Sequence, residues 1–260
     1  MRTSDASDPP LDAEQVRWAD LGMKTLIPFH GHPFLAHGMS ALADGGIRKV
    51  CVVVGPGDHP IREYLRRVEA GTGLRRLEVQ VAVQERPTGS AHALLAAEAF
   101  AGDDPVLVVN GDNLYPAAVI DEVRRLDGDG LAGFRARALV EQSAIEASRI
   151  ASFALISVDE RGCLDRIVEK PDAAEAAAFG PDPMVSMTCW CFTPAMFDAC
   201  RRVTPSARGE HELPDAVRLR MRADGACVRV LPVEAGVLDL TRRSDIPRVE
   251  ALLRGRAVRL

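Results

Sequence analysis

The sequence predicts an α/β protein with a mixed, mostly parallel sheet, and three observations support this prediction. Residues 106–109 form an unbroken apolar run, which is typical of a strand buried on both faces. Such runs alternate with helix-like segments through the first half of the chain, as parallel strands require. Asn110, Gly111 and Asp112 come directly after the run, and ligands of open α/β sheets lie just beyond the carboxyl ends of strands.

The first half of the chain supplies three strands and three helices. Pro33 begins the first helix, and Gly45 and Gly46 end it. The expected helices are 33–44, 60–70 and 90–100, and the expected strands are 50–54, 77–83 and 105–111. Residues 1–15 are polar and include Pro9 and Pro10, so we expect them to be disordered or loosely packed.

The second half is organised differently and predicts a mixed sheet that continues the first and carries a second substrate. The expected strands are 131–139, 151–159, 187–192 and 226–233, and the expected helices are 194–203, 213–223 and 246–254. Neither a repeat nor a long linker interrupts the sequence. We therefore treat residues 1–260 as one domain, with an irregular segment at 1–16 and a short C-terminal helix within 241–260.

Composition narrows the class of protein. The net charge of −5 lacks the basic excess of a nucleic-acid-binding chain, and no apolar run is long enough to span a membrane. The polar N-terminus is not a signal peptide, so the six cysteines are expected to be reduced thiols in a cytoplasmic protein. Cys189 and Cys191 lack zinc-knuckle spacing and fit a strand better than a metal site.

Three motifs carry candidate chemistry. In QERPTGSAHA, Gly89 allows close backbone approach, Gln84 offers two hydrogen bonds to a planar edge such as a nucleobase, and His92 is expected to be packed or capping. In DRIVEKPD, Glu169 and Lys170 suit a sugar hydroxyl and a phosphate, although a surface ion pair is the alternative.

The third motif is a pair of aspartates, Asp112 and Asp239, each of which follows an apolar strand. Two strand-end carboxylates can hold a metal ion against a phosphate. The alternatives are that Asn110, Gly111 and Asp112 only turn the chain, and that Asp239 only caps a segment.

Together these motifs resemble the sugar-1-phosphate nucleotidylyltransferases. The segments QERPTGSAHA, VLVVNGDN, EKP, ARGEHELPDAV and VLDLTRRSDI occur in the order seen in that family, and MKTLIPFHGHPFLAH resembles its stretch after the phosphate loop. The resemblance implies a Rossmann-like three-layer α/β/α sandwich of the nucleotide-diphospho-sugar transferase type. It also implies an enzyme that joins a nucleoside triphosphate to a sugar 1-phosphate with Mg²⁺ and releases pyrophosphate.

Site residues follow from the same resemblance. It places nucleotide binding within residues 17–115 and sugar-phosphate binding within 116–240. Arg17, Lys24 and Lys170 would be catalytic, Glu169 and Thr188 would contact the sugar, and Asp112 and Asp239 would hold magnesium. The nucleotide-binding residues would be Gln84, Pro87, Gly89, Ser90 and Gly111. The resemblance leaves open the base, the sugar and the oligomeric state, and a homo-oligomer is one possibility. Neither nucleic acid nor a membrane is an expected partner.

The N-terminus departs from the family, which begins with an apolar strand and a glycine-rich phosphate loop. Arg17 keeps the family's spacing to Lys24, but DPPLDAEQV precedes it. Three solutions are open: the neighbouring strands pair directly, another segment or subunit inserts, or the native start lies upstream, which we favour. The departure also keeps a rival in view, a non-catalytic nucleotide-sugar-binding or regulatory homologue. A glycosyltransferase is a third candidate, but Asn110 replaces the first Asp of its metal motif.

Overall fold

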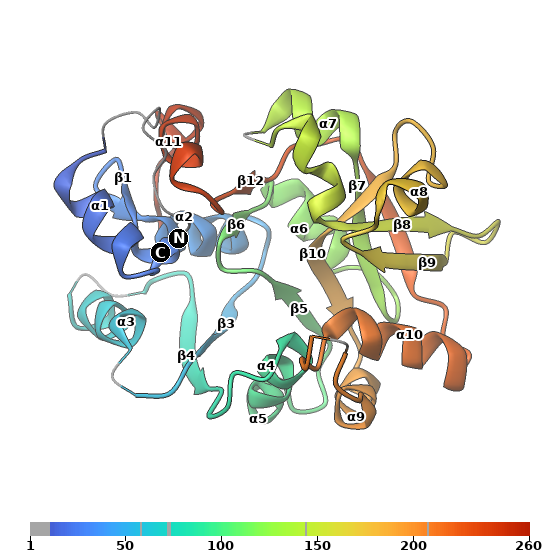
Figure 1. The fold of residues 1–260 in the computed structure, drawn as a ribbon. Helices are drawn as coiled ribbons and strands as arrows, with labels where there is room; N and C mark the ends of the chain where they lie inside the picture. The colour runs from blue at the N-terminus through green and yellow to red at the C-terminus, as the bar shows by residue number, and fades with distance from the viewer. Residues whose placement is uncertain (1–10, 58, 72–73, 144, 207) are drawn as a thin grey trace.

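The computed structural model describes residues 11–260 except 58, 72–73, 144 and 207, and shows an α/β/α sandwich (Figure 1). The expectation for residues 1–10 lies outside this range. Residues 11–16 were expected to be irregular, and this is wrong from Ala13 onward, where helix α1 (Ala13–Asp20) begins. Its N-terminus is capped by Asp12, whose carboxylate accepts from Gln15 N–H while the Gln15 side chain accepts from Asp12 N–H.

The main sheet has six strands in the order β11-β7-β10-β8-β9, with β5 on β10. Its strands are β5 (Val106–Val109), β7 (Gly130–Arg135), β8 (Ala154–Val158), β9 (Leu164–Glu169), β10 (Met184–Phe192) and β11 (Arg229–Val233). β10 is antiparallel to β5, β7 and β8, and β11 is parallel to β7. The sheet is therefore mixed, as predicted: β5, β7, β8 and β11 share one direction, while β9 and β10 run against them. The expectation that it is mostly parallel is wrong for the described pairings, because β10 lies between strands of opposite direction and only β7–β11 is a parallel pair.

Helices cover both faces of this sheet. One apolar cluster joins α4 (Ser90–Ala96), α9 (Ala195–Arg202) and α10 (Leu213–Ala223) to the face that carries Trp190. A second cluster joins α6 (Ala117–Val123) and α7 (Ala136–Gln142) to the opposite face, where Cys189 and Cys191 lie. The alternation along β10 confirms that these cysteines belong to a strand.

The first part of the chain forms a smaller unit beside this sheet. Strands β3 (Lys49–Val54) and β4 (Glu78–Val83) form a separate parallel pair, covered by α2 (Phe34–Asp44) and α3 (Pro60–Ala70). Within residues 11–260 as described, β3 pairs only with β4, and β5 pairs only with β10. Direct closure of the sheet over the missing strand, one of the three expected solutions, is therefore wrong.

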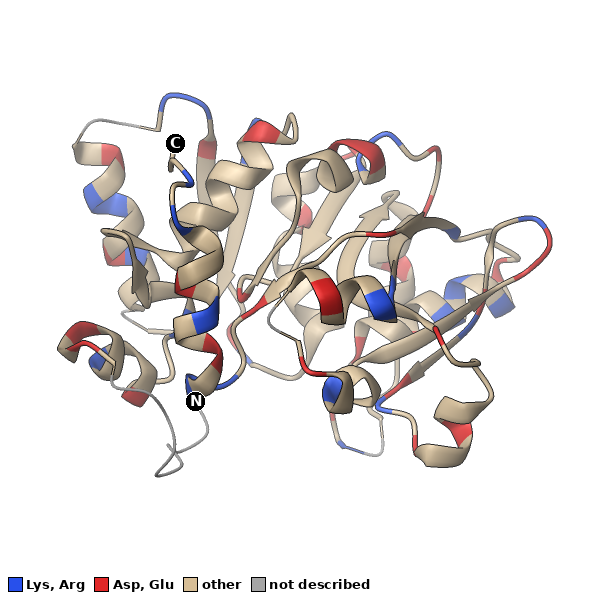
Figure 2. Ribbon diagram, turned by 90° about the horizontal axis from the view of Figure 1, so that it is seen from above, with Lys and Arg blue, Asp and Glu red and all other residues tan. Residues whose placement is uncertain are grey.

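The remaining elements are short, and several connect the two units. They are η1 (Lys24–Leu26), β1 (Pro28–Phe29), β2 (His32–Pro33), α5 (Glu98–Ala101), β6 (Asn113–Leu114), η2 (Ala147–Ser152), α8 (Ala173–Ala177), β12 (Leu238–Asp239), η3 (Arg243–Asp245) and α11 (Ile246–Leu253). Acidic and basic residues are interspersed along the ribbon (Figure 2), and many form local ion pairs such as Arg66–Glu63. None of the described helices is long and apolar enough to cross a bilayer.

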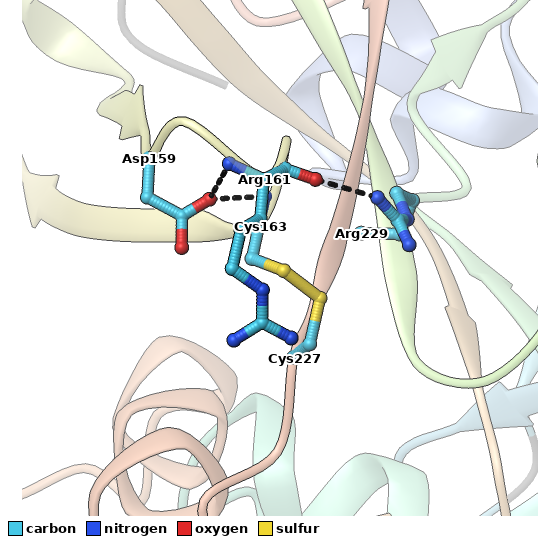
Figure 3. The surroundings of a disulfide bond; sticks show 5 residues. All are labelled: Asp159, Arg161, Cys163, Cys227 and Arg229. Atoms are coloured by element: carbon cyan, nitrogen blue, oxygen red, sulfur yellow. Dashed lines mark hydrogen bonds between the residues drawn. A yellow bond between two sulfur atoms is a disulfide. The ribbon is translucent and has the colours of Figure 1, made fainter.

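One covalent link was not expected. Cys163 and Cys227 form a disulfide between the turn before β9 and the segment before β11, across 64 residues of sequence (Figure 3). The turn at Cys163 is also held by Asp159, whose carboxylate accepts from the backbone N–H groups of Arg161 and Cys163. The prediction that all six cysteines are reduced is thus wrong for this pair; Cys51, Cys189, Cys191 and Cys200 are free thiols.

Candidate functional site

Asp112 lies just beyond the carboxyl end of β5, as predicted, and beside Lys24. Nζ of Lys24 donates to Oδ2 of Asp112 at 3.3 Å, and both side chains keep partial exposure, 27% and 30%. Burial raises the pKa of the Asp112 carboxyl above its ordinary value; the charge of Lys24 opposes this effect, and the nearby Asp239 adds to it. The site thus combines a partly open carboxylate with an ammonium group from a segment 88 residues away.

Asp239 reaches the same place through β12. This strand pairs antiparallel with β6, which sets Asp239 opposite Asn113. Asn113 Nδ2 donates to Oδ1 of Asp239 at 3.1 Å, and the backbone N–H of Leu240 donates to the carbonyl of Asp112 at 3.0 Å. The structure therefore brings the two predicted metal-binding aspartates onto neighbouring segments.

A buried arginine, which the sequence did not point to, fixes Asp239. The guanidinium of Arg149 donates to Oδ2 of Asp239 at 2.6 Å and to Oδ1 of Asp245 at 3.0 Å. All three side chains are at most 7% exposed. Oδ2 of Asp245 accepts from the backbone N–H groups of Thr241 and Arg242, so this network ties η2 to the segment after β12.

The donor set at this place suits a hard divalent cation whose other ligands come from water and substrate. A carboxylate has about four lone-pair positions, so Asp239 keeps acceptor capacity beyond its bonds to Asn113 and Arg149. Asp112 is engaged only by Lys24 through its side chain in the described part of the chain. No cluster of three metal-ligating side chains occurs among the described residues, so the protein alone would supply a partial shell, as Mg²⁺ sites often do.

The loop after β4 is held by its own side chains. Gln84 Nε2 donates to the carbonyl of Gly89 at 3.0 Å, so this amide holds the loop and leaves its Oε1 available. Ser90 Oγ accepts from the N–H of Leu213 at 2.9 Å, at the start of α10. Pro87 is exposed in the same loop. Gly111 lies outside this loop, and a Cβ added to it would lie 3.3 Å from Cγ2 of Thr25.

Gly89 has a structural reason to be glycine. Its φ is 122°, and a Cβ there would lie 2.4 Å from the carbonyl oxygen of His211. The backbones of the two segments are bonded directly: His211 N–H donates to the carbonyl of Thr88 at 2.7 Å. His92 stacks on the His211 ring with centroids 3.9 Å apart, which agrees with its expected packing role. Burial, with His211 and Arg86 nearby, lowers the pKa of His92.

We expect Gly89→Ala to lower the free energy of unfolding by about 2–4 kcal/mol, because the new methyl group meets backbone atoms and the residue must keep a φ that disfavours side chains. Urea denaturation followed by circular dichroism measures the change. Gly102→Ala is the matched control, since Gly102 also has a positive φ, of 56°, but no atom within 4 Å of a built Cβ. Equal effects of the two substitutions would show that the contact with His211 is unimportant.

Glu169 and Lys170 line a different cavity, of ≈ 590 Å³, together with Arg208, Glu212 and Arg218. Burial raises the pKa of the Glu169 carboxyl, and the positive charges of Lys170, Arg208 and Arg218 counteract this rise. Lys170 adopts a φ of 48°, which turns the chain between β9 and Pro171. In the described part of the chain no ion pair links Lys170 to a carboxylate, so the structure does not support the alternative of a surface ion pair.

Two predicted residues lie elsewhere. Thr188 sits at a bulge of β10 with a φ of 58°, and its carbonyl accepts from the Tyr115 hydroxyl at 3.1 Å. It lines a second cavity with Asn110 and Gly111, away from the set around Lys170. Arg17 is exposed on α1 with its guanidinium 5.1 Å from the centroid of the Trp18 ring, and it lines neither cavity.

The motif ARGEHELPDAV contributes Arg208 and Glu212 to the cavity that Lys170 lines, although no site role was predicted for them. Arg208 in this motif donates to Glu212 at 2.8 Å, and Ser206 Oγ donates to the same carboxylate at 2.6 Å. These contacts lower the pKa of Glu212 against the opposing effect of burial, so Glu212 is an anion that holds Arg208 at the cavity wall. Arg208 could have been predicted as a phosphate-binding residue, because it is an arginine within a motif that resembles the family.

A nucleotidyl transferase family model matches residues 20–239 of the chain. Among curated proteins, the low-salt glycan biosynthesis nucleotidyltransferase Agl11 of Haloferax volcanii is 30% identical over 89% of this chain. The UTP–glucose-1-phosphate uridylyltransferase AglF of the same organism is 29% identical over 88% of this chain and 87% of its own length. The chain spans only 60% of the length of Agl11.

Solved structures agree on the fold. UDP-glucose pyrophosphorylase in complex with UDP-glucose superposes with a TM-score of 0.67 at 16% identity, covering 94% of this chain and 96% of that one. This likeness confirms the nucleotide-diphospho-sugar transferase type of fold that the motifs implied.

Proposed function

This chain belongs to the nucleotidyl transferase family, and on that premise we propose that it transfers a nucleoside monophosphate from a nucleoside triphosphate to a sugar 1-phosphate. The observation that carries the proposal is the convergence of Lys24, Asp112 and Asp239 from three distant segments at the end of β5. Relatives named as a uridylyltransferase and a thymidylyltransferase of glucose 1-phosphate support this substrate class. The sugar, like the base, is left open.

In the proposed reaction an oxygen of the sugar phosphate forms a bond to the α-phosphorus, the bond from that phosphorus to the β-phosphate oxygen breaks, and pyrophosphate leaves. The nucleophile is already an anion, so no general base is required. The protein's task is to bring two polyanions together and to neutralise the charge that grows on the leaving group. Lys24, which lies beside Asp112, would serve the second part of this task.

We assign the triphosphate to residues 17–115 and the sugar phosphate to 116–240. Gln84, with Oε1 free of the loop bond, would accept a hydrogen bond from a base, while Pro87, Gly89, Ser90 and Gly111 shape the surrounding backbone. Glu169 and Lys170 would contact the sugar hydroxyls and the phosphate from the ≈ 590 Å³ cavity. Arg208, on the same wall, adds a second cation for that phosphate.

Asp112 and Asp239 are the residues that would hold a divalent cation, for which we propose Mg²⁺ because all the donors are oxygens. Such an ion would neutralise phosphate charge when bound. Arg149 and Asn113 orient Asp239, and Lys24 stays within reach of Asp112 and of a phosphate beside it.

Purified protein should release pyrophosphate when Mg²⁺, one nucleoside triphosphate and one sugar 1-phosphate are supplied together. A panel of the common triphosphates against hexose 1-phosphates, with pyrophosphate as the readout, identifies the pair. The rival, a non-catalytic homologue, predicts that the same protein binds nucleotide or nucleotide sugar in calorimetry yet releases no pyrophosphate with any pair.

Lys170→Ala should raise the KM for the sugar 1-phosphate by roughly 10- to 100-fold while changing the KM for the triphosphate little, because a charge-assisted contact is worth about 1.5–3 kcal/mol. Steady-state kinetics with each substrate varied in turn gives both constants. Lys49→Ala, a change at an exposed lysine outside this cavity, is the control. Equal rises in both constants would instead assign Lys170 a structural role.

A further inference from the structure

Strands β3 and β5 lie next to each other without pairing (Figure 1). A cavity of ≈ 480 Å³ separates them, lined by residues 49–53 of β3 and by all of β5, residues 106–109. We refer to this cavity as the strand slot. It runs along both strands and reaches Asn110, Gly111 and Thr188 beyond β5.

Two walls of the strand slot are the backbone edges of β3 and β5, which can form hydrogen bonds. A strand directs backbone N–H and C=O groups to both sides, and β3 uses one side for β4 while β5 uses one side for β10. The opposite sides face the slot and have no strand partner among the described residues of the chain. Unpaired edges of this kind are templates for another strand, since each buried backbone group needs a partner.

Helices form the other two walls, and these are apolar. Helix α2 forms one of these walls with Leu35, Met39 and Leu42. The other wall is formed by α4, α5 and the residue between them, with Leu94, Ala97 and Phe100. These helices pack into different apolar clusters, so the slot is lined on both faces of the sheet. An occupant strand would therefore need apolar side chains at successive positions, as inner strands of an α/β sheet have.

Charge restricts the occupant further. Only Lys49 and Asp104 among the lining residues are charged, so a charged segment would bury ions without partners along most of the slot. Residues 1–10 of the chain are MRTSDASDPP, whose two aspartates and two prolines do not meet these requirements. A polypeptide strand fits better than a lipid or other apolar ligand, which would leave both strand edges unpaired.

We propose that the strand slot binds, as a separate molecule, one extended peptide segment that is uncharged and apolar on both faces and pairs with β3 and β5 at once. The lengths of these strands, six and four residues, set the length of the paired part. Bound in this way, the peptide would join the β3–β4 pair to the six-stranded sheet. This is strand addition between two edges instead of one.

The test uses a fluorescein-labelled peptide with a core of six Val, Ile and Ala residues and charged, solubilising ends, titrated with the purified chain in fluorescence anisotropy. The expected result is saturable binding that weakens about tenfold or more when alternate backbone amides are N-methylated, because two or three hydrogen bonds are then lost. Hydrogen–deuterium exchange should slow on β3 and β5 together.

A variant that fills the slot gives a second measurement. Gly38 on α2 lines the slot, and a Cβ added there meets no atom within 4 Å, so Gly38→Phe should place a ring in the slot without disturbing the helix. We expect it to weaken peptide binding at least tenfold while leaving the thermal transition unchanged or higher. Ala174→Phe, on the exposed face of α8, is the matched control and should bind as the parent does.

Four outcomes would overturn the proposal. The first is an absence of saturable binding by the parent protein, and the second is equal binding of the methylated and unmethylated peptides. The third is protection from exchange only on β4, whose outer edge also has no strand partner in the part of the chain that the structure describes. Self-association of the protein that protects β3 and β5 without peptide would assign the slot to a second copy and would also count against it.

Discussion

Asp112→Asn should reduce pyrophosphate release by about 10²–10³-fold or more while the fold stays intact. The substitution keeps the shape of the side chain but removes the partly exposed carboxylate that lies beside Lys24 and near Asp239. Loss of one charge-stabilising group at a reacting phosphate is worth about 3–4 kcal/mol. Steady-state turnover gives the size of the effect, and electron paramagnetic resonance with Mn²⁺ shows directly whether the cation is still bound.

Asp103→Asn is the control, since this exposed aspartate lies at the other end of β5 and should leave both readouts unchanged. A folded Asp112→Asn protein with near-parental turnover would remove Asp112 from the proposed machinery. Turnover lost with Mn²⁺ binding retained would instead assign the cation to other ligands and leave Asp112 a role with Lys24.

Arg149→Leu should cost about 3–5 kcal/mol of unfolding free energy, the largest stability loss that we expect from a single substitution in this chain. The arginine is the shared partner of Asp239 and Asp245, and its removal leaves two buried carboxylates without their cation. Burial already raises the pKa of Asp245, and Arg149 counteracts that rise. Chemical denaturation at neutral pH measures the loss.

Arg66→Leu provides the comparison for an exposed ion pair, because the Arg66 side chain that pairs with Glu63 is 67% exposed. This substitution should change the free energy of unfolding by less than about 1 kcal/mol. Arg149→Lys should recover only part of the loss, since one ammonium cannot donate as a fork to both carboxylates. Similar values for Arg149→Leu and Arg66→Leu would mean that the buried network contributes little net stability.

Much of the fold follows from periodicity, and the exceptions have physical causes. The expected helix at 213–223 is α10 in full, because its apolar spacing is regular. The expected strand at 131–139 ends at Arg135, and α7 takes the remaining residues. Within 131–139, Arg135 and Arg137 alternate with apolar residues as they would in a strand, so the pattern did not show where an inner strand gives way to a helix whose packing face is apolar.

Residues of the candidate site were predicted where they belong to a sequence motif. They were missed where only the tertiary packing brings them to the site. Asp112 and Asp239 could be paired because each ends an apolar strand, and the register of β6 and β12 brings them together. Arg149 sits in a short 3₁₀ segment with no pattern around it, and its role exists only once two distant carboxylates surround it. Thr188, predicted to contact the sugar, lies at the bulge in β10 and lines the strand slot with Asn110 and Gly111.

The contact between Gly89 and His211 predicts how each position would tolerate substitution in a library. The obstruction at Gly89 consists of the backbone nitrogen, carbonyl carbon and oxygen of His211, which every amino acid shares. No choice of side chain at position 211 can therefore relieve a Cβ at position 89. Saturation mutagenesis should return glycine alone at 89 and a broad spectrum at 211, and no second change at 211 should rescue a substituted 89.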